Sequence, residues 1–111
     1  MATKTQTKHP TPSFPSGDSR ALAVLAAEPA TLAERHELRF FAAIDDLDRV
    51  EYAAVHLGGS VQAWLVKHQG DPNPGTVVRV DAGLDPVTAR RGLEDALGLE
   101  DGDVLWWAAG A

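Results

Sequence analysis

Residues 38–44 alternate between apolar and other positions, with Leu38, Phe40, Ala42 and Ile44 at every second place. A period of two is typical of a β-strand, because successive side chains point to opposite faces of a sheet. Comparable runs bounded by Gly, Pro or Asp predict three further strands, over residues 61–68, 76–81 and 103–108.

The Ala-rich segment 20–28 is expected to form a short helix that Ser19 caps and Pro29 ends. A further helical turn is predicted at residues 31–34, where Thr-Leu-Ala-Glu has the form of a capping box. Helices this short are marginal in isolation, so both segments need a surface on which to pack.

Residues 46–57 have two interpretations. Apolar positions recur at steps of three, four and three before a glycine pair, which favours an amphipathic helix. The alternative is a hairpin whose strands, 50–57 and 60–67, are joined by a Gly-Gly turn. The helix is preferred, because paired alanines favour helix and the preceding aspartates suit a helix N-terminus. The residues concerned are Leu47, Val50, Ala54 and Leu57, the pairs Ala53-Ala54 and Gly58-Gly59, and Asp45, Asp46 and Asp48.

Asp85 and Pro86 mark the start of the last predicted helix, and Gly98 marks its end. The resulting order over residues 37–109 is βαββαβ, which predicts a ferredoxin-like α+β fold with a four-stranded antiparallel sheet and two helices on one face. The chain is expected to comprise a flexible Thr/Pro-rich arm (1–18), an N-terminal helical segment (19–35) and an α+β domain (36–111).

Charge is distributed unevenly along the 111 residues. Residues 1–17 carry Lys4 and Lys8 and no acidic residue, whereas all 16 acidic residues lie in 18–111 with the eight remaining Lys and Arg. An acidic body repels nucleic-acid phosphate and anionic lipid, so neither is an expected partner. A protein with a basic surface, or a second copy in a homo-oligomer, is expected instead.

The composition also limits the compartment and the means of stabilisation. The chain has no cysteine, which excludes disulfides and thiolate chemistry. No apolar run approaches the roughly 20 residues that a membrane-spanning helix needs, and the N-terminal residues lack the apolar centre of a secretory signal. A cytoplasmic protein is therefore expected.

No catalytic, metal-binding or cofactor-binding residue is predicted. The histidines lack metal-ligand spacing, and the acidic runs 45–48 and 100–103 lack the spacing of a calcium loop. The serines have no evident base, and no phosphate-binding loop or nucleophile elbow occurs. The residues considered are His9, His36, His56 and His68, and Ser13, Ser16 and Ser60.

Two family resemblances accompany these patterns. Residues 91–105, RGLEDALGLEDGDVL, are similar to a segment of AbrB-type swapped-hairpin transcription regulators. That resemblance implies DNA binding, which the acidic charge opposes. The expected layout also resembles ACT-type small-molecule-sensing domains and implies ligand sensing. An RNA-binding module is disfavoured, because the strand 76–81 lacks the Lys/Arg-Gly-aromatic run of such domains.

Alternation along the predicted strands places aromatic and apolar side chains on the sheet face away from the helices. Such a patch is typical of an interface. Its cover is expected to be the segment 20–28, a second copy or another protein, and Phe14 is a candidate anchor in the arm. We therefore expect a non-catalytic interaction module, such as an adaptor, inhibitor or assembly subunit, with a ligand sensor or a virion or shell component as alternatives. The candidate interface residues are Phe41, Trp64, Val66 and Arg79, with Trp106 and Trp107.

Overall fold

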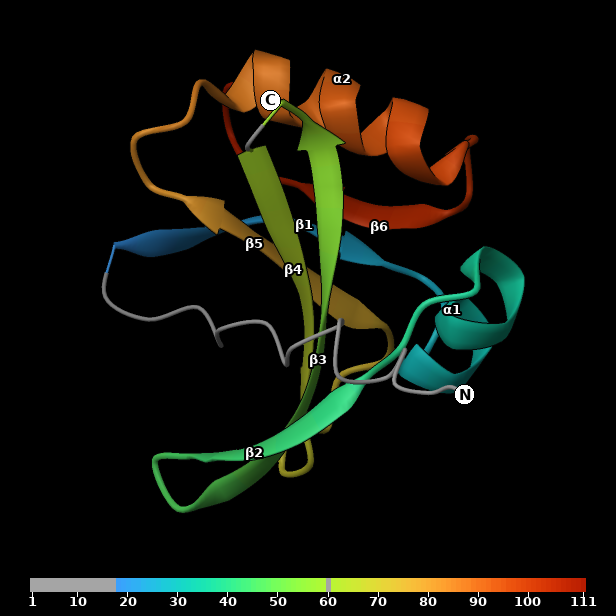
Figure 1. The fold of residues 1–111 in the computed structure, drawn as a ribbon, viewed down its shortest axis with the longest axis vertical. Helices are drawn as coiled ribbons and strands as arrows, with labels where there is room; N and C mark the ends of the chain where they lie inside the picture. Colours follow the sequence, from blue (N-terminus) through green and yellow to red (C-terminus); the bar gives the residue numbers. More distant parts are fainter. Residues whose placement is uncertain (1–17, 60) are drawn as a thin grey trace, which may run out of the picture.

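The computed structural model describes residues 18–59 and 61–111 and shows one antiparallel sheet of six strands with two helices (Figure 1). The strand order across the sheet is β2-β3-β4-β5-β1-β6, so β2 and β6 form its two edges. The elements in chain order are β1 (Ser19–Leu25), α1 (Pro29–His36), β2 (Phe41–Asp45), β3 (Asp48–Gly58), β4 (Val61–His68), β5 (Thr76–Asp81), α2 (Pro86–Leu97) and β6 (Val104–Trp107).

The second half of the chain agrees with the sequence prediction. β4 and β5 have the predicted bounds, and β6 lies within the predicted strand 103–108. The helix α2 begins after Asp85, whose side chain accepts a hydrogen bond from the backbone N–H of Thr88 at 3.0 Å. It ends at Gly98, which has φ 60°. These local signals act within a few residues and need no distant partner.

The predicted four-stranded ferredoxin-like sheet is wrong, and residues 46–57 are one reason. They form no helix: Asp46 and Leu47, with φ 52° and 68°, make the two-residue turn between β2 and β3. β3 and β4 then form a hairpin, as the alternative interpretation expected, although Gly58 belongs to β3 and pairs with Val61 instead of lying in the turn. Both faces of β3 bury apolar side chains, so the steps of three and four along it do not mark a helical stripe.

The predicted helix over 20–28 is the second error. Residues Ser19–Leu25 form β1, which lies inside the sheet between β5 and β6. Leu22, Ala23 and Leu25 are at most 1% exposed. Pairing on both sides and burial of these side chains in the main core outweigh the modest preference of alanine for helix. Pro29 is the first residue of α1 rather than the end of a preceding helix.

The main hydrophobic core lies between the helices and one face of the sheet. Leu32 of α1 and Leu93 of α2 pack with Leu65 and Val78 of the central strands. Figure 1 shows α2 near the Gly58 end of β3, whereas the turn between β2 and β3 projects from the opposite end. Ile44, which lies beside this turn near the end of β2, is therefore 70% exposed.

Gly75 fits a close approach between the loop before β5 and the end of β1. Its φ is +93°, and a Cβ added there would lie 2.1 Å from the carbonyl oxygen of Leu25. The backbone N–H of Gly75 donates to Glu28 Oε2 at 2.6 Å. Only glycine combines this conformation with this contact.

Candidate interaction surface on the open sheet face

One row of side chains crosses all six strands on the sheet face away from the helices. Each residue lies directly opposite the next in the antiparallel register, and directly opposed residues point to the same face. All six are aromatic or β-branched apolar residues. In sheet order the cross-strand row is Phe41, Tyr52, Val66, Val77, Val24 and Trp106.

The two ends of the cross-strand row differ in exposure. Toward β3 and β4, Tyr52 is 4% exposed and Val66 is 2% exposed, and both cluster with the fully buried Val50. Phe41, Ala43 and Trp64, which are partly buried, pack against this cluster, and neither helix contributes to it. At the β6 edge, by contrast, Trp106 is 47% exposed. The open face thus has a buried aromatic end and an exposed one.

A second row lies beside the first and carries a fixed positive charge. Trp64 of β4 lies opposite Arg79 of β5, and Arg79 lies opposite Ala21 of β1. The Arg79 guanidinium donates two hydrogen bonds to Ser19, one to its Oγ and one to its carbonyl oxygen, both at 2.9 Å. Arg79 therefore ties the start of β1 to this face and holds a cation beside the indole of Trp64.

Trp64 also lines a surface pocket of about 460 Å³, which lies on the sheet where β4 begins and β5 ends. Gln62 and Asp81, which flank it in the sheet, supply polar groups, and Leu84 supplies apolar surface. A concave site with an aromatic wall and a few polar groups is the usual form of a small-ligand pocket.

The β2 margin of the open face is held by aromatic and charged contacts. The rings of Phe41 and Tyr52 have centroids 6.0 Å apart at a tilt of 37°, and the Arg39 guanidinium lies 5.1 Å from the Phe41 centroid. Near the turn, His68 Nε2 lies 2.8 Å from Asp45 Oδ2. The Phe41–Tyr52 contact joins β2 to β3, and the His68–Asp45 contact joins β2 to β4.

The structure brings together five of the six predicted interface residues. Phe41, Trp64, Val66, Arg79 and Trp106 all face the open side, through the two rows described above. Trp107 faces the helices and packs on the main core. Phe14 lies outside the described residues.

Sequence reasoning missed three members of the cross-strand row. Tyr52 was assigned to the predicted helix over 46–57, and Val24 was assigned to the predicted helix over 20–28. Val77 was not singled out on β5. Period-two alternation along β3, with Val50 and Tyr52 on one face, is the signal that identifies Tyr52 once the hairpin is chosen.

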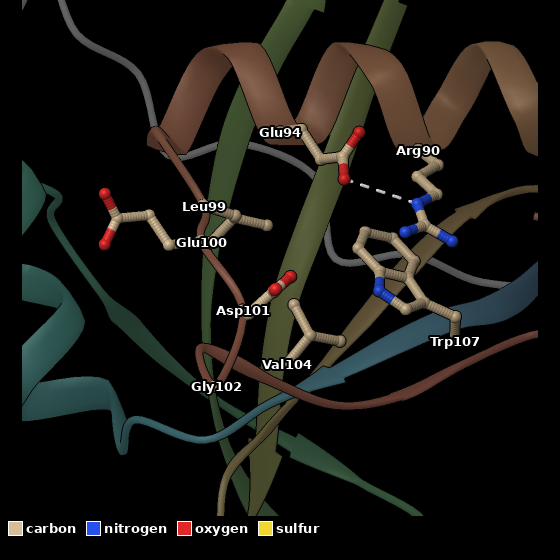
Figure 2. A pocket seen from close by; sticks show the side chains of 8 residues that line it. All are labelled: Arg90, Glu94, Leu99, Glu100, Asp101, Gly102, Val104 and Trp107. Atoms are coloured by element: carbon tan, nitrogen blue, oxygen red, sulfur yellow. Dashed lines mark hydrogen bonds and ion pairs between the residues drawn. The ribbon is translucent and has the colours of Figure 1, made fainter.

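A second pocket, of about 290 Å³, lies between α2 and β6 on the helix side. The Arg90 guanidinium stacks over the Trp107 ring at 4.3 Å from its centroid and donates to Glu94 Oε2 at 3.3 Å. It also contacts the carbonyl oxygen of Ala111 at 3.4 Å. Figure 2 shows Arg90 over the indole, with the Glu100 side chain directed away from it. These contacts anchor the segment after β6 against α2.

Within residues 18–59 and 61–111, no three His, Asp or Glu side chains are arranged to hold a metal ion. The one resolved pKa shift is that of Asp85, whose pKa lies below its ordinary value mainly because Thr88 donates two hydrogen bonds to it. That shift belongs to the helix cap and not to a cleft.

Neither α1 nor α2, the helices of the described residues, is long and apolar enough to cross a membrane. The layout on which the ACT-type resemblance rested is absent, because the sheet has six strands. The segment similar to AbrB-type regulators spans the end of α2 and the start of β6. The chain matches no known protein family, and neither the curated proteins nor the solved structures include one significantly similar to it.

Proposed function

We propose that this chain is a non-catalytic protein-interaction module that binds another protein through its open sheet face. The observation that supports this is the cross-strand row, which runs from Phe41 to the exposed Trp106. An adaptor, an inhibitor or an assembly subunit would each use such a surface.

The β6 end of the cross-strand row is the proposed binding site for the partner protein. Leu105 is 56% exposed and Trp106 is 47% exposed, and both lie on an edge strand. Residues 104–111 contain no charged side chain, although charges on an edge strand are a common protection against pairing with other chains. Large exposed aromatic residues concentrate binding energy at interfaces.

The proposed partner is a protein whose apolar patch is bordered by basic residues. Residues 18–111 carry 16 acidic residues against eight Lys and Arg. A basic partner would be steered toward this body, whereas two copies of it repel each other. Binding of a second copy is therefore less favoured than binding of a basic partner. Sedimentation of the pure protein measures whether it self-associates.

The test compares proteins captured from the native host by the immobilised wild type and by two variants. Trp106→Ser removes the exposed aromatic of the row, and Val87→Ser, on α2, removes an apolar side chain that is 50% exposed outside the row. At least one protein should be captured by the wild type and by Val87→Ser but not by Trp106→Ser. Equal capture by all three, together with unchanged sedimentation, would rule out this surface.

A small-molecule sensor is the second candidate function, and the pocket beside Trp64 favours it. The prediction is a metabolite that raises the Tm of the wild type and fails to raise that of Gln62→Ala. A metabolite screen without any thermal shift argues against sensing and leaves the proposal of protein binding in place.

A further inference from the structure

The pocket beside Trp64 lies between the adjacent ends of β4 and β5. Ala63 of β4 lies opposite Val80 of β5. Continuing this register by one residue places Gln62 beside Asp81, on the same sheet face as Trp64. The pocket has a volume of about 460 Å³, which is sufficient for a small organic molecule.

Asp81 gives this pocket a negative charge in a fixed place. Its Oδ1 accepts a hydrogen bond from the backbone N–H of Gly83 at 2.9 Å, and its carbonyl oxygen accepts one from the N–H of Leu84 at 3.0 Å. These two bonds close a turn and orient the carboxylate. Among the described residues that line the pocket, Asp81 carries the only charged side chain. A carboxylate accepts more than one hydrogen bond, so the same group can also bind a cation.

The indole of Trp64 is a second group that attracts a cation. The side chain lines the pocket and also packs against the buried cluster of β3 and β4. The face of an indole ring attracts an ammonium or guanidinium group that lies within about 6 Å of the ring centroid. Trp64 and Asp81 are diagonal neighbours across β4 and β5, and such neighbours lie about 7–8 Å apart. One cationic group can therefore contact both side chains.

The Arg79 guanidinium is held toward β1 and not toward the pocket. Arg79 lies opposite Trp64, but two of its nitrogens donate to Ser19 of β1, both at 2.9 Å. Arg79 does not line the pocket. Residues 18–111 carry 16 acidic residues against eight Lys and Arg, so the field of the whole body attracts a cation more than an anion.

We propose that this pocket binds a small organic cation. Its ammonium or guanidinium group lies between the Asp81 carboxylate and the Trp64 indole, and its apolar chain packs on Leu84 and Val61. The Gln62 amide oxygen accepts a further hydrogen bond from the cationic group. This inference rests on ligand sensing, the second candidate function, and names the class of ligand that the pocket takes.

The experiment titrates the full-length protein with three probes that share a six-carbon chain and differ in the head group: hexylammonium, 1-hexanol and hexanoate. NMR records the indole N–H of Trp64 and the backbone amides of Asp81 and Gly83. Hexylammonium should shift these signals to saturation and bind at least tenfold more tightly than the other two probes, while the indole N–H of Trp106 stays unchanged. No saturable shift with hexylammonium, or binding of hexanoate that is equally tight, would overturn the proposal.

Asp81→Asn tests the carboxylate without removing the turn, because the amide oxygen of asparagine still accepts from the N–H of Gly83. This variant should bind hexylammonium at least tenfold more weakly and 1-hexanol as the wild type does. Asp101→Asn is the matched control, since it removes one exposed negative charge outside the pocket, and should change hexylammonium binding less than twofold. Equal weakening in both variants would show an effect of net charge alone and overturn the proposal.

The outcomes separate this inference from the functions on which it bears. A neutral or anionic metabolite whose thermal shift depends on Gln62 would support sensing and overturn the assignment of a cation. Tight, Asp81-dependent binding of hexylammonium supports the cation site even where the metabolite screen finds no natural ligand. The capture experiment depends on Trp106, so its failure leaves the cation site standing.

Discussion

Tyr52 on β3 lies directly opposite Val66 on β4, and both are almost fully buried on the sheet face to which neither helix contributes. The same row ends at Trp106, which is 47% exposed. One face of the sheet therefore has a buried end, which stabilises the fold, and an exposed end, which we propose binds another protein.

Substitutions at the two ends should separate these roles. Val66→Ala removes two methyl groups from a buried site and should lower the free energy of unfolding by about 2 kcal/mol. Trp106→Ser should lower it by no more than about 1 kcal/mol, because half of the side chain is already in water. Urea unfolding measures both values. A larger loss for Trp106→Ser than for Val66→Ala would contradict the assignment of roles.

Leu47→Gly should raise stability. Leu47 is 96% exposed and has φ 68° in the turn between β2 and β3, so it contributes little packing and holds a conformation that suits glycine. In such two-residue hairpin turns glycine is preferred at the second position. We expect a gain of about 0.5–1 kcal/mol in urea unfolding. A loss would mean that Leu47 makes a stabilising contact.

Gly75→Ala should destabilise the fold. The new Cβ would meet the Leu25 carbonyl oxygen, and the residue would be held at φ +93°. Backbone strain together with the clash should cost about 2 kcal/mol or more. Thermal unfolding of Gly75→Ala beside Gly59→Ala, whose Cβ meets nothing within 4 Å, separates the clash from the strain at positive φ. Equal losses in both variants would show that the contact with Leu25 is unimportant.

The cap of α2 should make stability depend on pH. The backbone N–H and the hydroxyl of Thr88 donate to Asp85, and together with the Arg20 charge they hold the pKa of Asp85 below its ordinary value. A lowered folded-state pKa stabilises the protein above the unfolded pKa of about 4, and this stabilisation is lost as the pH falls through the folded-state pKa. The Tm difference between wild type and Asp85→Asn should therefore be largest near neutral pH and disappear at low pH. A difference that is independent of pH would contradict this.

The sequence predicted those parts of the fold that depend on nearby residues. Asp85 and Gly98 define α2 through contacts within a few positions, and the runs at β4 and β5 have clear turn residues on both sides. The alternation within β4 and β5 was enough to place Trp64, Val66 and Arg79 on one face.

The failures lie where distant pairing decides the structure. Residues 20–25 have the alanine content of a helix, but β5 and β6, more than 50 residues away, pair with them on both sides. Residues 50–57 bury side chains on both faces of β3. Their apolar positions therefore fit the repeat of a helix as well as the period of two of a strand. Local propensity cannot report such long-range contacts. Tyr52 was missed for this reason.

We propose that the exposed end of the cross-strand row binds another protein, and quantitative capture from the native host measures this binding. A protein should be retained by the wild type and by Val87→Ser and lost with Trp106→Ser. Indistinguishable capture by the three folded proteins would contradict it.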